Sequence, residues 1–218
     1  MSFYRWTSIL FLLAAISVSS KSHKIFASAL PPNVHASSSV NGRFLVVAEW
    51  EYENPNDKLR RIRRTTYKIM ETESFINSKD RLTSPVKFWS DSAWSWEVTL
   101  EGLEGKRIFW PMISDDGKSL ILIAVTAPIP GQPVLEIYQR NDHKGQLIRS
   151  YQITDLWTPK QVDPDGRGLF IFTDATPEWF AGAILSFSSD GQQLIYRNQW
   201  NEVLRIRVDD GVISRSNR

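Results

Sequence analysis

The 218-residue chain contains no cysteine, only three histidines, and nearly balanced charge, with 26 Lys and Arg against 24 Asp and Glu. Without cysteine, disulfides, Cys-ligated metals and Cys nucleophiles are excluded. His23, His35 and His143 have no His, Asp or Glu at ligand spacing on a helix or strand, so we expect no zinc site, no Ser-His-Asp triad and no cofactor. Balanced charge gives no indication of a nucleic-acid partner or an anionic membrane.

Long apolar runs are also scarce, and the clearest one lies at the N-terminus over residues 9–18. Arg5 precedes this run, and small residues follow it at Ser19 and Ser20. This layout predicts a secretory signal peptide over residues 1–20, with cleavage near Ser20 or, alternatively, after Ala29. An uncleaved anchor is the other interpretation, although the run is short for a transmembrane helix. An exported chain without cysteine fits the bacterial envelope, so we predict a secreted or periplasmic protein with no integral membrane segment after cleavage.

The signal segment is followed by residues with little helical or strand character. Two consecutive prolines, Pro31 and Pro32, exclude a helix there, and residues 36–39 are small and polar. We therefore predict a linker over residues 21–41. The remaining residues, 42–218, are numerous enough to bury one core, and we expect them to form a single all-β domain.

One short pattern occurs three times in this domain, at residues 39–46, 114–121 and 188–195. Each copy reads Ser, any residue, Asp or Asn, Gly, two further residues and then an apolar pair. Gly42, Gly117 and Gly191 lie 75 and then 74 residues apart. The pattern predicts a tight turn that leads into a buried strand, and its recurrence indicates an architecture built from one unit used several times. We interpret Asp116, Asp165 and Asp190 as turn residues rather than calcium ligands.

Hydrophobicity alternates with period 2 along most of the domain, which predicts about twelve short strands and no long helix. Residues 44–53 and 60–70 form an expected hairpin, in which Glu51 faces Arg63 and Tyr52 faces Ile62. The basic run 60–64 is then explained by glutamates on the neighbouring strand, although an anion-binding patch is the alternative. Residues 71–76 are expected to form a short helical turn. The other expected strands cover residues 94–100, 107–113, 120–126, 134–140, 147–153, 169–173, 183–188, 194–198, 203–208 and 212–214.

A strand followed by Ser-x-Asp-Gly and a second strand resembles a blade of the WD40-like propeller repeats of the TolB type. The matching residues are 187–195 and 112–121, with a weaker copy at 39–46 and a partial copy at 164–171. The resemblance implies propeller-like antiparallel four-stranded units. The chain departs from it in lacking a Trp-Asp dipeptide and in its spacing of about 75 residues, because an ordinary blade has roughly 40–50 residues. A β-sandwich remains the alternative fold.

Two stretches, residues 88–97 and 174–182, combine aromatic rings with carboxylates near the ends of strands. Binding residues often collect in such loops on rigid β scaffolds. We therefore predict binding residues in these stretches, namely Asp174, Glu178, Trp179, Asp91 and Trp94. The structural alternative is that the tryptophans, Trp94 and Trp96 in particular, pack within the sheet.

These observations favour a binding or protein-interaction module without catalytic residues, whose partner is a polypeptide or a glycan of the cell envelope. One alternative is a carbohydrate-active enzyme, which would need two carboxylates converging in a cleft, from among Asp91, Glu97, Asp174 and Glu178. The other alternative is a structural repeat protein that completes its fold by assembling into an oligomer.

Overall fold

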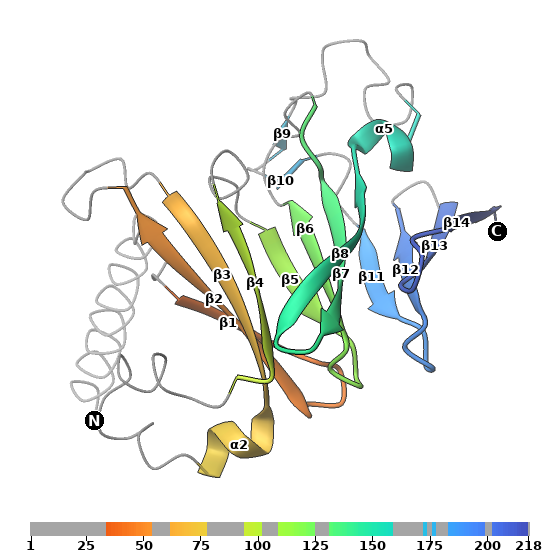
Figure 1. Cartoon of the computed structure of the whole chain (residues 1–218). Coiled ribbons are helices and arrows are strands. Elements are labelled where there is room, and N and C mark those ends of the chain that lie inside the picture. Colours follow the sequence, from red (N-terminus) through yellow and green to blue (C-terminus); the bar gives the residue numbers. More distant parts are fainter. Residues whose placement is uncertain are drawn as a thin grey trace, which may run out of the picture. The chain divides into compact units, whose positions relative to one another are not determined.

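The computed structural model describes residues 34–53, 62–77, 94–101, 109–124, 131–158, 172–173, 176–177, 183–198 and 202–217. Strands dominate these residues, and the two helices among them are short: α2 (Thr72–Asn77) and α5 (Ile153–Leu156) (Figure 1). The predicted all-β class is therefore confirmed, as is the short helical turn after residue 71. Neither helix of this described part has the length and apolar character needed to cross a membrane.

The strands group into three four-stranded antiparallel units in which neighbours along the chain pair with one another. The first unit consists of β1 (Val34–Ser38), β2 (Phe44–Tyr52), β3 (Ile62–Glu71) and β4 (Trp96–Glu101). The second consists of β5 (Phe109–Ile113), β6 (Ser119–Ala124), β7 (Leu135–Asn141) and β8 (Lys144–Tyr151). The third consists of β11 (Ile184–Phe187), β12 (Gln193–Arg197), β13 (Glu202–Arg207) and β14 (Ile213–Asn217).

The first two units join through their last strands into one eight-stranded sheet, in the order β1-β2-β3-β4-β8-β7-β6-β5. The junction is a single parallel pair, Glu97 with Lys144, so the two antiparallel units remain distinct within this sheet. The third unit is a separate four-stranded sheet, and β9 (Phe172–Thr173) pairs only with β10 (Thr176–Pro177) among the described strands. Among the described strands, the first strand of each unit lies at an edge of its sheet.

The three copies of the sequence pattern form the turns between the first and second strands of each unit, and their hydrogen bonds repeat. In the second copy the Ser114 hydroxyl donates to the Asp116 carboxylate at 2.6 Å, and the Lys118 amide donates to the same carboxylate at 3.0 Å. The first and third copies make the corresponding bonds. The three glycines have φ angles of 71°, 68° and 70°, a left-handed conformation that glycine adopts without steric cost.

These bonds support the interpretation of the turn acids as structural. Asp190 is fully exposed, and its pKa is lowered because the Ser188 hydroxyl and the Gln192 backbone amide donate hydrogen bonds to the carboxylate. The same carboxylate geometry at Asp116 satisfies the backbone of the turn, as expected for Asp beside Gly. Asp165 lies outside the described residues.

The expected hairpin over residues 44–70 is present, with one shift in register. Tyr52 faces Ile62 as predicted, but Glu51 faces Arg64 rather than Arg63, because a bulge inserts one residue between the two pairs. Glu51 forms ion pairs with both arginines, at 3.6 Å to Arg63. The cross-strand charge interpretation of the basic strand therefore holds despite the shift.

The predicted linker over residues 21–41 is wrong in its later part, because residues 34–38 form β1. β1 pairs with β2 in antiparallel register from Val34 with Glu49 to Ser38 with Leu45. Its small polar residues concealed the strand, because the pairing comes from the backbone and from the turn that follows rather than from an apolar face. The fold therefore begins several residues earlier than composition indicates.

Candidate functional site: an apolar hollow

The first and second units pack closely around the turn at Gly117. The indole Nε1 of Trp96, which is 1% exposed, donates to the Gly117 carbonyl at 2.8 Å. The Phe44 ring covers the Cα of the same glycine. Asn41, in the first turn, bonds the second turn twice: its backbone amide donates to the Asp115 carboxylate at 2.9 Å and its side-chain amide to the Asp115 carbonyl at 3.0 Å.

The second and third units meet instead through the ends of β7 and β8 and through α5. The Tyr151 hydroxyl donates to the Gly211 carbonyl, and the Gln139 side-chain amide donates to the Val208 carbonyl at 3.0 Å. The rings of Trp157 and Tyr196 pack edge to face with their centroids 5.1 Å apart. Two of these contacts reach the segment 208–211, and the Val208 amide in turn donates to the Gln192 carbonyl at 3.0 Å.

The turn at Gly191 lacks the cover that the equivalent glycine has in the second unit. Phe44 follows Gly42 by two residues, and the residue at the same place in the second unit is Ser119. A serine cannot reach across to the next turn as the phenyl ring does, and no described atom lies within 4 Å of a Cβ built at Gly191. The first strands of the second and third units are therefore separated where those of the first and second units are in contact.

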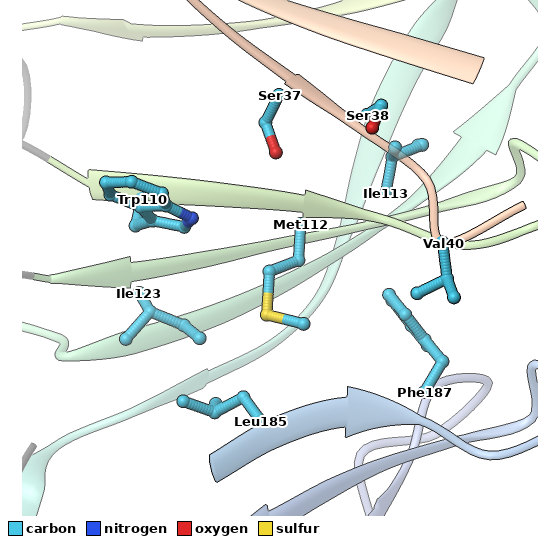
Figure 2. Close-up of a pocket in the computed structure, with 9 residues that line it drawn as sticks. All are labelled: Ser37, Ser38, Val40, Trp110, Met112, Ile113, Ile123, Leu185 and Phe187. Atoms are coloured by element: carbon cyan, nitrogen blue, oxygen red, sulfur yellow. The ribbon is translucent and has the colours of Figure 1, made fainter. Parts of the chain in front are cut away.

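A hollow of about 430 Å³ lies between these first strands (Figure 2). Every unit contributes to it: the first through β1 and its turn, the second through β5 and β6, and the third through β11. In Figure 2, Met112, Leu185 and Phe187 project into the space between their strands. The lining consists of Ser37, Ser38, Val40, Trp110, Met112, Ile113, Ile123, Leu185 and Phe187.

The chemistry of the hollow is apolar and uncharged. None of the nine lining residues is ionisable, and the two serines supply hydroxyl groups at the β1 side. Trp110 is 49% exposed and Val40 is 81% exposed, although both are large apolar residues that are normally buried. Such a surface can bind apolar groups, and the described residues that line it include no ionisable side chain.

The strongly shifted tyrosines lie at the packing surfaces and not in the hollow. Burial raises the pKa of Tyr151 to about 12, and burial likewise raises the pKa values of Tyr67 and Tyr196. The Tyr67 hydroxyl donates to the Phe109 carbonyl at 3.4 Å. All three groups are therefore neutral near pH 7 and contribute to packing between strands and units.

The residues predicted from the two aromatic and acidic stretches do not line the hollow where they can be placed. Asp91, Asp174, Glu178 and Trp179 lie outside the described residues. Trp94 is half-buried, and the Lys68 ammonium lies 5.1 Å from its ring centroid. Trp96 is a packing residue, in agreement with the structural alternative for that residue.

The sequence analysis did not identify Trp110, Leu185 and Phe187 as site residues, because apolar residues on a strand are normally expected to lie in the core. One signal was available: in residues 109–113, apolar side chains occupy both alternating faces. A strand of this kind needs cover on both sides, and β5 leaves Trp110 half exposed.

The comparisons with known proteins add little. No family model and no curated protein matches the chain. Among solved structures, it resembles the crystal structure of the tricorn protease with a TM-score of 0.31 and 10% sequence identity, covering 84% of this chain and 22% of that chain. The chain thus spans about a fifth of the length of that structure, and a TM-score this low assigns neither fold family nor function.

Proposed function

We propose that the chain is a binding module and that the hollow is its site for an extended polypeptide segment with uncharged, apolar side chains. The observation that carries this proposal is the lining, in which the first strands of all three units converge and none of the described lining residues is charged. A hollow of about 430 Å³ is at the smaller end of ligand sites, which suits a few side chains of a peptide.

The exposed side chains at this place support a partner. Soluble proteins rarely leave aromatic and aliphatic side chains together in solvent unless a ligand covers them. Trp110 combines a large apolar area with an indole N–H, which makes tryptophan frequent among the residues that dominate binding energy. Eight of the nine lining residues lie on strands, so the geometry of the site is held by the ladders of two sheets.

The wider setting is part of the same proposal. The repeated turn at the same place in each four-stranded unit supports three propeller-like blades, with β1, β5 and β11 as the equivalent first strands. The N-terminal apolar segment supports export to the bacterial envelope, where the polypeptide partner would be found. Cell fractionation of the chain with and without residues 1–20 tests export, and equal cytoplasmic retention of both forms would refute it.

Peptide display tests the binding site directly. Random decapeptides are selected on the purified chain, and the tightest binder is synthesised with an N-terminal fluorescein and titrated by anisotropy. We expect selected sequences without charge at their central positions. Replacing Trp110 by Ala should weaken binding at least about tenfold, because a partly buried aromatic anchor is removed.

Leu147→Ala is the matched control. Leu147 is 47% exposed on β8, nearly the same as Trp110, but it does not line the hollow. Its replacement should leave the affinity unchanged. Failure to select any uncharged peptide, or equal effects of Trp110→Ala and Leu147→Ala, would refute a polypeptide site in the hollow. Binding of glycans that depends on Trp110, in the absence of peptide binding, would also refute a polypeptide site in the hollow.

A further inference from the structure

We infer that a polypeptide in the hollow binds by adding as a strand to the free edge of β11, an inference that rests on the proposed function. Among the described strands, β11 pairs with β12 on one side alone. Strand addition supplies affinity through main-chain hydrogen bonds and specificity through alternate side chains. Three features of β11 support this mode: the direction of its backbone groups, the contrast with β5, and the side chains that face the hollow.

The alternation of hydrogen bonds between β11 and β12 determines which backbone groups of β11 point away from β12. The Ser188 amide donates to the Gln193 carbonyl at 2.8 Å, so hydrogen-bonded pairs recur every second residue toward the start of β11. Ser186 and Ile184 therefore direct their N–H and C=O groups toward β12. Leu185 and Phe187 direct theirs toward the opposite edge, where a partner strand could reach them.

The equivalent strand of the second unit cannot accept a partner in the same way. Pro111 stands three residues before Ser114, which is the place that Leu185 takes before Ser188. Proline has no backbone N–H, and proline on an edge strand is a common means of preventing strand addition. β5 also lies against β1. Of these two first strands, β11 alone keeps an outward N–H at this position.

The two residues of β11 that would bond a partner strand are also the two whose side chains line the hollow. Leu185 and Phe187 line the hollow with their side chains and also carry the outward N–H groups. Residues that face each other in a hydrogen-bonded antiparallel pair place their side chains on the same face of the sheet. The partner residues opposite Leu185 and Phe187 would therefore both bond β11 and insert their side chains into the hollow. Because the described lining residues carry no charge, we expect those inserted side chains to be uncharged.

Backbone methylation of the peptide tests this coupling on the unaltered protein. The selected, fluorescein-labelled decapeptide is made with N-methyl groups either on its alternate apolar residues or on the residues between them. Methylation of the apolar set should weaken binding about tenfold or more, because it removes amides that donate to β11. Methylation of the other set should have little effect. Equal effects of the two sets would overturn strand addition.

Two variants at one position test the β11 side. Leu185→Pro removes both the side chain and the outward N–H, whereas the matched control Leu185→Ala removes only the side chain. We expect Leu185→Pro to weaken peptide binding about fivefold more than Leu185→Ala. The dye anilinonaphthalene sulfonate binds apolar surface through its aromatic rings and needs no main-chain bonds, so its binding should fall equally in both variants.

The outcomes separate the two proposals. If Trp110→Ala weakens the peptide but the two Leu185 variants bind it equally, strand addition is wrong and the polypeptide site stands. If no peptide is selected, or if Trp110→Ala has no effect, the proposed function fails. Circular dichroism of each variant verifies that β structure is retained, and the methylated peptides decide the question even if Leu185→Pro does not fold.

Discussion

Replacement of Gly117 by Ala should destabilise the protein by much more than the same replacement at Gly42 or Gly191. The three glycines share φ angles near 70°, so a side chain imposes the same backbone strain of about 1–2 kcal/mol at each. At Gly42 and Gly191 no described atom lies within 4 Å of the added Cβ. At Gly117, Cζ of Phe44 would lie only 2.6 Å from it.

This overlap is difficult to relieve. Phe44 is 7% exposed, and the Gly117 carbonyl is held by the Trp96 indole, so neither ring nor turn can move freely. Overpacking of this kind costs about 1–3 kcal/mol, so the total for Gly117→Ala should be about 2–5 kcal/mol. Urea unfolding followed by tryptophan fluorescence measures each free energy of unfolding, with equal m-values as the test of comparability.

A double-mutant cycle identifies the cause. Phe44→Ala removes all the ring carbons that the added Cβ would meet. In that background, the cost of Gly117→Ala should fall to the value found for Gly42→Ala, because only the backbone strain remains. The reasoning is wrong if Gly117→Ala costs no more than the other two replacements. It is also wrong if its cost is the same with Phe44 and with Ala at position 44.

Three further predictions concern contacts between the units. Trp96→Phe keeps most of the ring but loses the bond to the Gly117 carbonyl, and urea unfolding should report a loss of about 1–3 kcal/mol from the unsatisfied carbonyl and the smaller ring. Asn41→Ala removes the side-chain hydrogen bond to the Asp115 carbonyl and the side-chain hydrogen bonds within its own turn. Calorimetry should therefore show a melting temperature lower by several degrees, and an unchanged melting temperature would refute the contact. Burial raises the pKa of Tyr151 to about 12, so near pH 10 the unfolded chain loses the phenol proton while the folded chain retains it. The free energy of unfolding should therefore fall between pH 10 and 12. Urea unfolding at each pH should show a shallower fall for Tyr151→Phe.

The parts of the fold that local sequence determines were predicted well. The Ser-x-Asp-Gly pattern fixes its own hydrogen bonds, so three turns with the same geometry could be expected at residues 39–42, 114–117 and 188–191. Period-2 alternation located most strands within a few residues. The register of the first hairpin was correct at Tyr52, but the bulge was not visible, because two adjacent basic residues, Arg63 and Arg64, fit the expected charge pairing equally well.

The hollow could not be predicted in the same way, because its lining depends on strands from three units whose equivalent residues lie about 75 positions apart. Each contributing residue, such as Met112 or Leu185, fits an ordinary core position in its own strand. Whether a neighbouring unit covers that residue depends on how the sheets pack, which period-2 patterns do not specify. β1 was missed for a related reason, since its pairing is not encoded by an apolar face of its own.

The difference between the two unit boundaries nevertheless has a cause in the sequence. Measured from the turn glycines, Ser119 occupies the place of Phe44, and the strand registers put Arg149 at the place of Trp96. The first boundary is therefore filled by two aromatic rings, which cover the next turn, while the second has a hydroxyl and an arginine whose stem packs against Gly211. The turns are the same at Gly117 and Gly191, so the turn cannot explain why only one of them is covered. The side chains of the preceding unit explain the difference, because the first unit covers Gly117 with aromatic rings and the second unit has no such ring near Gly191 among its described residues. An open space beside the first strand of the third unit is the consequence.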